Sequence, residues 1–293
     1  MPALDNIGSV NGHAVGIIMK ELVRRAISAI RNERIVFETR LKAGADGAMD
    51  DMLTSADLKA QEVYLRGLRE CFPTCGVIGE ENEVAIPPKA PTTAHFTIDP
   101  LDGTKAFVRR QSHGVGTMIA LVDGKRVLAA YVGDVNTREI YGFRPGSEKA
   151  YRITDFDAVE PLEARARPKR PLRKRYVLLR DPPSEYSDLS RAFIAGMDRL
   201  QIDGGSIGIW TARLWKDEVG AALLPAGWET PWDSSPVIGI SKQIGMAFLK
   251  PSSNGKSWQE FDPPVPLERF RREHDVLIVP RARLSELKRA SGR

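Results

Sequence analysis

The chain has 293 residues, of which 42% are hydrophobic, and a formal net charge of +5. This length can bury one large or two moderate hydrophobic cores. No stretch approaches the roughly 18 consecutive apolar residues of a membrane-spanning helix, and Met1 to Asp5 lack the basic and apolar regions of a signal peptide, so we expect a cytoplasmic protein without membrane contact. We expect Cys71 and Cys75 to be reduced thiols and not a redox or metal pair.

Two amphipathic helices are predicted near the start of the chain. Apolar residues recur at helical spacing from Val15 to Ile30 and again from Ala56 to Leu68. Just before the second pattern, Asp51 precedes an expected helix N-cap and Asp57 lies in the first helical turn. Asp57 would also be favourable there simply as a negative charge near a helix N-terminus.

The segment from His95 to Thr104 carries the strongest chemical signal. An apolar strand is expected to end at Pro100, which lacks a backbone donor, so that Asp99 and Asp102 lie on a turn and can converge on one point. Hard divalent cations prefer such oxygen ligands. Gly103 permits close backbone approach, and a helix beginning at the next residue would point free N–H groups at an anion. The pattern indicates a metal-dependent phosphate site, and an Asx turn followed by a helix cap is the alternative.

Further carboxylates come from other parts of the chain. Glu80 and Glu81 follow the short apolar run Val77 to Gly79, although a solvated loop is the alternative there. Asp233 precedes Val237 to Ile240, a run typical of a buried helix. Carboxylates gathered at one site repel one another unless cations neutralise them. Together the acidic clusters favour a shared cation site.

The remaining elements are predicted from apolar patterns. Gly116 to Phe143 alternates around Asp123-Gly124, which predicts a hairpin of antiparallel strands. Farther along, the patterns predict a strand, two helices and a late buried strand, in the order Val177 to Leu179, Leu189 to Leu200, Ile209 to Leu224 and Asp275 to Val279.

A basic run lies between Arg165 and Arg175 and is interrupted by Pro168 and Pro171. Such a run is typical of a solvated loop and marks a junction between two halves of the chain. The alternatives are an electropositive approach for a phosphorylated substrate and a nucleic-acid contact. The run lacks interleaved aromatic residues, so base stacking is not indicated and nucleic-acid binding is not favoured.

Four blocks in order along the chain resemble the inositol monophosphatase superfamily of magnesium-dependent, lithium-sensitive phosphatases. The blocks are Asp51-x-x-Thr54-x-x-Asp57, Gly79-Glu80-Glu81, Asp99-Pro100-Leu101-Asp102-Gly103-Thr104 and Trp232-Asp233. The resemblance implies a layered sandwich of helices and sheets, with an α+β half (1–160) that carries most metal ligands. An α/β half (161–293) would carry Asp233 and substrate contacts. A homodimer is also implied.

The resemblance also implies two or three Mg²⁺ ions. Glu80, Asp99 and the backbone carbonyl of Leu101 would bind the first ion. Asp102 and Asp233 would complete a second site, with Asp99 bridging the two ions.

The same resemblance implies which residues would activate the attacking water and which would contact the substrate. A water on the first ion would be the nucleophile, activated by Glu80 and by Thr104, whose hydroxyl would pair with Asp51. The N–H groups of Gly103 and Thr104 would hold the phosphate, and Gly205 and Ser206 would contact the substrate. Lys42 is open to two interpretations: it could reach this site, or it could be a surface lysine.

The substrate is less well specified than the chemistry. A small polyol or sugar phosphate such as inositol 1-phosphate is favoured because all the metal-site residues are present. However, Ala226 stands where inositol-specific members carry a glutamate, Glu229 could replace that residue only if the loop were shifted, and Ser234-Ser235-Pro236 follows Trp-Asp in place of the usual small residues. Adenosine 3′,5′-bisphosphate and histidinol phosphate therefore stay open. A regulatory protein that contacts RNA or the transcription machinery through the basic run is the alternative from another class.

Overall fold

The computed structural model of the chain describes residues 11–44, 47–49, 51–163 and 170–290. Two long helices begin the fold, α1 (Gly12–Glu33) and α2 (Ser55–Cys71), which confirms both predicted amphipathic helices. Thr54 and Asp57 form a capping box at the start of α2, so each satisfies a backbone N–H of the other. Asp57 is thereby fixed inside the protein, with none of its surface exposed.

The first sheet is built from β3 (Gly76–Gly79), β4 (Ala85–Ile86), β5 (His95–Asp102), β6 (Gly116–Asp123), β7 (Arg126–Asp134), β8 (Ile140–Phe143), β9 (Ala150–Ile153) and β10 (Val159–Leu162). The strand order is β10-β9-β8-β7-β6-β5-β3-β4, with β3 parallel to β5 and the other neighbours antiparallel. β6 and β7 form the hairpin predicted around Asp123-Gly124. A separate antiparallel ribbon joins β1 (Thr39–Lys42) to β2 (Asp51–Thr54).

The prediction that a strand ends at Pro100 is wrong. β5 continues through Pro100 to Asp102, which pairs with Gly116 of β6. The pairing shifts register between Asp99 and Asp102, which is the irregularity of a β-bulge. A bulge leaves residues unpaired in the ladder, so the missing N–H of the proline is tolerated there. The helix expected after Gly103 is present as the short α3 (Thr104–Val108).

The second sheet is built from β11 (Tyr176–Leu179), β12 (Arg199–Ile202), β13 (Ala221–Leu224), β15 (Met246–Pro251), β16 (Trp258–Phe261) and β18 (Val276–Pro280). Its order is β12-β11-β13-β18-β15-β16, with β11 parallel to both of its neighbours. β11 and β18 confirm the two strands predicted in this half. A small ribbon pairs β14 (Gly227–Glu229) with β17 (Phe270–Arg272).

Both helices predicted in the second half are too long. The first is α4 (Asp188–Ala195), and the chain then forms β12. The second is α5 (Ile207–Trp215), and the apolar run Ala221–Leu224 forms β13. Periodicity cannot distinguish a short apolar run in a buried strand from one in a buried helix. Here the run forms a strand because it pairs with β11 and β18.

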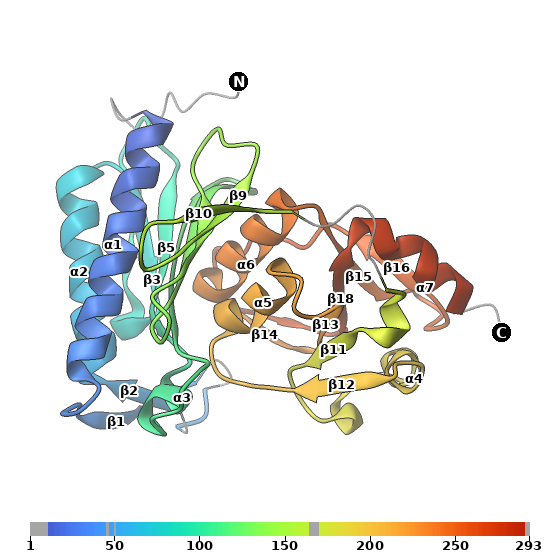
Figure 1. Ribbon diagram of the computed structural model, residues 1–293. Helices are drawn as coiled ribbons and strands as arrows, with labels where there is room; N and C mark the ends of the chain where they lie inside the picture. Colours follow the sequence, from blue (N-terminus) through green and yellow to red (C-terminus); the bar gives the residue numbers. More distant parts are fainter. Residues whose placement is uncertain (1–10, 45–46, 50, 164–169, 291–293) are drawn as a thin grey trace.

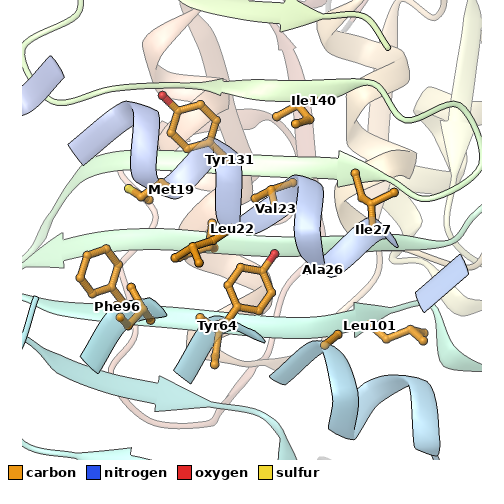
Figure 2. Packing of buried hydrophobic residues seen from close by; sticks show 14 of the residues in the cluster. Met19, Leu22, Val23, Ala26, Ile27, Tyr64, Phe96, Leu101, Tyr131 and Ile140 are labelled. Carbon is orange, nitrogen blue, oxygen red and sulfur yellow. The ribbon is translucent and has the colours of Figure 1, made fainter. Parts of the chain in front are cut away.

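Helices and sheets alternate in five layers (Figure 1). α1 and α2 cover one face of the first sheet, and Figure 2 shows Met19, Val23 and Ile27 of α1 lying over the strands that carry Tyr131 and Ile140. α5 and α6 (Pro231–Gln243) lie between the two sheets. α4 and α7 (Leu284–Ala290) cover the far face of the second sheet.

Alternating side chains produce these layers. In β6, Ile119 belongs to the core under α1 and α2, whereas its neighbour Met118 belongs to the middle core. In β18, Ile278 faces the middle core and Leu277 faces the α4 and α7 layer. Successive strand residues point to opposite faces, so a continuous apolar run indicates a sheet buried on both sides. α6 is likewise buried on most sides, as predicted for Val237 to Ile240.

Four 3₁₀ turns complete the described elements: Glu81–Glu83, Leu172–Lys174, Pro183–Glu185 and Arg281–Arg283. Within the described ranges, no helix has the length and apolarity needed to cross a membrane. Of the basic run, residues 165–169 lie outside the described residues. Arg175 donates to Asp217, so its guanidinium is engaged within the fold.

Gly133→Ala should destabilise the protein by about 1–3 kcal/mol because it overpacks the contact between α1 and the first sheet. A Cβ at Gly133 would lie 2.5 Å from Val23 Cγ1 and 2.8 Å from Ile27 Cδ1. β-Branched side chains in a helix have one strongly preferred rotamer, so these two cannot easily move aside. Urea unfolding measures the effect. The control is Gly204→Ala, where a Cβ meets nothing within 4 Å; equal losses in both variants would contradict the packing account.

Candidate active site

Three carboxylates from two distant segments meet at one point. Asp99 and Asp102 lie near the end of β5, and Asp233 lies in the first turn of α6. Their ligand oxygens all lie within 4.8 Å of one another. Thr230 caps α6 by accepting the Asp233 N–H (3.3 Å), and its hydroxyl donates to Asp233 Oδ2 (2.7 Å). The structure thus brings together the three aspartates that the sequence singled out.

The N-terminus of α5 holds Asp102. The Ser206 hydroxyl donates to one carboxylate oxygen, and the backbone N–H groups of Ile207 (3.0 Å) and Gly208 (2.9 Å) donate as well. Burial raises the pKa of Asp102, and these hydrogen bonds oppose that rise. Ser206 was predicted as a substrate contact; its side chain is fully buried and positions Asp102.

Three glycines allow the loops around Asp102 to pack backbone against backbone. Gly103 has φ +88°, and a Cβ there would lie 2.3 Å from the Gly114 carbonyl oxygen and 2.6 Å from the Ser206 nitrogen. Gly205 has φ +79°, and its Cβ would lie 2.5 Å from the same carbonyl oxygen. A side chain at Gly103 would collide with Gly114 and with the start of α5, and one at Gly205 would collide with Gly114, so both glycines are required by the close approach.

Lys42 lies at this site and not at the surface. Its ammonium group donates to Glu80 Oε1 (2.8 Å) and to Glu81 Oε1 (2.6 Å). Burial opposes the charge of Lys42, but the two carboxylates outweigh it and raise the lysine pKa. Burial and the neighbouring Glu80 raise the pKa of Glu81 to about 8. Lys42, the last residue of β1, therefore places one positive charge beside the acidic cluster.

The cluster carries more negative charge than Lys42 balances. Burial, followed by the charges of Glu80, Asp102 and Asp233, raises the pKa of Asp99 well above its usual range. Burial, followed by the charges of Asp102 and Glu80, raises the pKa of Asp233 to about 7. Asp99 Oδ1 is buried and has no hydrogen-bond partner among the described residues. An unpaired buried carboxylate oxygen among like charges fits a bound divalent cation.

The expected pairing of Thr104 with Asp51 is wrong. The Thr104 hydroxyl lies 3.2 Å from Asp57 Oδ1 and 3.0 Å from the Leu101 carbonyl oxygen. Asp51 Oδ1 instead accepts the Met52 N–H (2.9 Å) and lies 4.0 Å from Lys105 Nζ. The reason is local: the capping box turns Asp57 inward, whereas Asp51 is part of the partly exposed ribbon.

Comparison with known proteins identifies the family of this chain. The inositol monophosphatase family matches residues 13–271. The chain belongs to this family. A histidinol-phosphatase of Chlorobaculum parvum is 30% identical over 211 residues, which cover 67% of this chain and 71% of that protein. As a member of the inositol monophosphatase family with phosphatase relatives, the chain is a phosphoric monoester hydrolase.

Solved structures agree on the fold. The extragenic suppressor protein SuhB of Bartonella henselae superposes with a TM-score of 0.72 at 19% identity, covering 96% of this chain and 99% of that one. An IMPase/NADP phosphatase complexed with Mg²⁺ and phosphate superposes with a TM-score of 0.69 at 16% identity, covering 95% of each chain. The layered sandwich predicted from the four motif blocks is confirmed.

Two cavities in this inositol monophosphatase family member meet at Asp233. The smaller, of about 300 Å³, contains Lys42, Asp51, Glu80 and Glu81. The larger, of about 660 Å³, extends between α6, the second sheet and the ribbon of β14 and β17. Its wall is mostly apolar and includes four aromatic side chains, Trp228, Phe248, Phe261 and Phe270. Through Asp233, the carboxylate cluster therefore borders a space that can hold an organic group.

Neither position considered for binding polyol hydroxyls holds a carboxylate that is free of other partners. Ala226 lines the larger cavity but offers no polar side chain, and its N–H donates to Asp275 Oδ1 (3.2 Å). Glu229 Oε1 accepts from Arg272 Nε (2.8 Å), and its other oxygen accepts from the Ser234 hydroxyl. Ser234, one of the departures from the family pattern, thus helps to fix Glu229 against the wall.

Sequence analysis missed two residues at this site. Thr230 gave no distinct signal beyond its place before an expected helix, where threonine is a common N-cap. Arg180 directly follows the strand Tyr176–Leu179, and it lines the larger cavity. A charged residue at the carboxyl end of a parallel strand is the signal that could have identified it, because ligands in open α/β sheets bind at that edge.

Asp99→Asn should raise the unfolding midpoint of the metal-free protein by a few degrees, because it removes one of several mutually repelling buried charges. The same variant should lose the stabilisation that millimolar Mg²⁺ gives to the wild type. Thermal unfolding in EDTA and in Mg²⁺ measures both effects. Asp262→Asn is the control, since that carboxylate is 83% exposed. A lower midpoint in EDTA with Mg²⁺ stabilisation intact would make Asp99 a structural residue instead.

Proposed function

We propose that this chain is a Mg²⁺-dependent phosphomonoesterase that hydrolyses a small organic phosphate by direct attack of water. The observation that carries the proposal is the convergence of Asp99, Asp102 and Asp233 around an unpartnered buried carboxylate oxygen. Family membership supports the reaction class, and the related IMPase/NADP phosphatase complexed with Mg²⁺ and phosphate supports the choice of ion.

The residues divide into two metal-binding groups. Glu80, Asp99 and the Leu101 carbonyl would hold one Mg²⁺, and Asp102 and Asp233 would hold a second, with Asp99 shared. Bound divalent ions polarise phosphoryl oxygens and lower the pKa of a bound water. The Lys42 ammonium group donates to Oε1 of Glu80 and to Oε1 of Glu81. The second oxygen of Glu80 would therefore hold the ion while the lysine stays in place.

The protein's own groups orient the water and the phosphate. Glu80 accepts the proton of the attacking water, and Thr104 orients that water because Asp57 fixes its hydroxyl. The N–H groups at the start of α3, from Gly103 and Thr104, bind the phosphoryl oxygens. No covalent intermediate is required, so no nucleophilic side chain is needed. Asp51, on the wall of the smaller cavity, has no direct contact with Thr104 in this arrangement and would act at most through Lys105.

The substrate proposal is an organic phosphate whose leaving group carries a heteroaromatic ring. The polyol or sugar phosphate favoured by the sequence stays a prediction, because Ala226 offers no polar side chain and both carboxylate oxygens of Glu229 already accept hydrogen bonds. The apolar cavity of about 660 Å³ instead supports the alternatives with a heteroaromatic ring in the leaving group. Adenosine 3′,5′-bisphosphate and histidinol phosphate both meet this description.

Two further predictions concern assembly and partners. The homodimer implied by the family resemblance stays a prediction. RNA or transcription-machinery binding through the basic run has no support, because part of that run lies outside the described residues and Arg175 is engaged with Asp217.

Phosphate release should depend on Mg²⁺ and should be faster for adenosine 3′,5′-bisphosphate or histidinol phosphate than for inositol 1-phosphate. A panel of these three esters and fructose 1,6-bisphosphate, assayed in Mg²⁺ and in EDTA, measures this. Release in EDTA equal to that in Mg²⁺ would reject the metal-dependent reaction. Fastest release from inositol 1-phosphate would restore the polyol prediction.

Thr104→Ala should lower kcat by about 100-fold or more and change KM little, because the hydroxyl acts on the attacking water and not on the bound ester. Steady-state kinetics on the best substrate of the panel measure both constants. Thr93→Ala is the matched control, since that hydroxyl donates to Asp123 (2.6 Å) at the end of β5 and β6 opposite to Asp102. A rise in KM at unchanged kcat would assign Thr104 to substrate binding.

A further inference from the structure

The larger cavity contains an arginine that has no carboxylate partner. Arg180 Nη2 donates to the Gly205 carbonyl oxygen (2.5 Å). Its Nη1 is buried and has no hydrogen-bond partner in the part of the chain that the structure describes. No carboxylate of a described residue forms an ion pair with it. A buried guanidinium with an unused donor is costly unless something else supplies an acceptor.

Other basic groups on the cavity wall differ from Arg180. Arg272 is paired with Glu229 (2.8 Å) and donates to backbone carbonyls, and Arg271 lies 3.7 Å from Glu273. Lys250 lies over the Phe261 ring, 5.4 Å from its centroid, and is only partly buried. Arg180 is thus the cavity arginine that forms no ion pair with a described carboxylate, and its charge acts only at longer range, where it opposes the rise that burial causes in the pKa of Asp102.

Arg180 is linked to the carboxylate cluster through Gly205 and the residue that follows it. The carbonyl that it contacts belongs to Gly205, and the next residue, Ser206, donates its hydroxyl to Asp102. Arg180 therefore lies on the cavity wall at the carboxyl end of β11, close enough to the carboxylate cluster for its charge to oppose the rise that burial causes in the pKa of Asp102. A bidentate, planar donor in this place matches an oxyanion on the substrate, such as a phosphate or carboxylate group.

The apolar wall of the cavity favours an apolar group in the substrate, in contrast to the anion that Arg180 favours. Phe248, Phe261 and Phe270 line the cavity together with the strand residues Val276 and Ile278. Such a wall favours a flat, apolar ring over a group that bears hydroxyls on every carbon, because hydroxyls placed there would lose their hydrogen bonds to water.

We propose that the substrate is a phosphomonoester whose leaving group carries both a ring and a second anionic group, and that Arg180 selects the substrate by binding this second anion. The inference rests on the proposed phosphomonoesterase reaction. The scissile phosphate lies at the carboxylate cluster and the ring packs against the aromatic wall. The second anion accepts from Arg180, whose buried Nη1 must turn toward the cavity to donate.

Two matched pairs of esters test the second anion. Adenosine 3′,5′-bisphosphate and adenosine 3′-monophosphate differ by one phosphate, and 4-carboxyphenyl phosphate and phenyl phosphate differ by one carboxylate. Release of phosphate in Mg²⁺ gives kcat/KM for wild type, Arg180→Gln and Arg180→Lys. Within a pair, the ratio of the two constants isolates the effect of the anion. The pair with the larger ratio identifies the kind of anion bound.

For at least one pair, the wild type should prefer the ester with the second anion at least tenfold. Arg180→Gln should remove most of that preference, mainly through KM, and should change kcat/KM for the anion-free ester by less than about threefold. Arg180→Lys should recover part of the preference, because it restores the charge without the fork. Arg66→Gln, an exposed arginine of α2 paired with Glu70, is the control and should leave every ratio unchanged.

Three results would overturn the inference. Equal loss on both esters of each pair would make Arg180 a support for the Gly205 turn and nothing more. Equal kcat/KM for both esters of each pair in the wild type would remove the second anion from the substrate. Absence of Mg²⁺-dependent release from all four esters and from the wider panel would overturn the proposed reaction as well, which separates the two failures.

Discussion

Repulsion between buried carboxylates is the constraint on which the rest of this structure depends. Asp99, Asp102 and Asp233 would separate in a protein free to relax, yet their oxygens lie within 4.8 Å of one another. Each is held by a different element: β5 fixes Asp99, the N-terminus of α5 fixes Asp102, and the Thr230 cap fixes Asp233. Hydrogen bonds and packing elsewhere must offset this unfavourable charge, as is common where function requires a strained or repulsive arrangement.

The same constraint explains the unusual density of backbone contacts around the site. Gly103, Gly114 and Gly205 let three loops approach with no side chain between them. Because of this close packing, the carboxylates cannot easily move apart. Loops normally carry binding residues with some mobility, but here the bulge in β5 and the starts of two helices replace a flexible loop with regular structure. Precision in the ligand positions is therefore built into the backbone.

Sequence reasoning identified the residues that approach one another but not every contact between them. The three aspartates could be predicted from the sequence because each lies at the start or end of an apolar element. The ends of such elements lie together at the edges of the layers. The partner of Thr104 was not recoverable: Asp51 and Asp57 lie at equal spacing on either side of Thr54, and only the capping box shows which one turns inward. Similarly, the apolar run Ala221–Leu224 becomes a strand only because neighbouring strands are ready to pair with it.

Arg180 illustrates the limit of motifs. It belongs to none of the four motif blocks, and the role that we propose for it comes from what surrounds it in space: a carbonyl from a turn that is distant in sequence, and no carboxylate of a described residue within ion-pair distance. Residues that decide specificity often act in this way, since the chemistry of a family is fixed by shared motifs while substrate choice depends on the shape and charge of the walls.

Helix α6 has one further consequence. It packs against β5, β6 and β7 of the first sheet and against β15 of the second, and it also carries Asp233. The ion site that we propose would then join β5 of the first sheet to a helix that packs against both sheets. By linkage, a cation that binds there stabilises the arrangement in which α6 is packed against β5. The metal would thereby act as a cross-link across the core that the two sheets share.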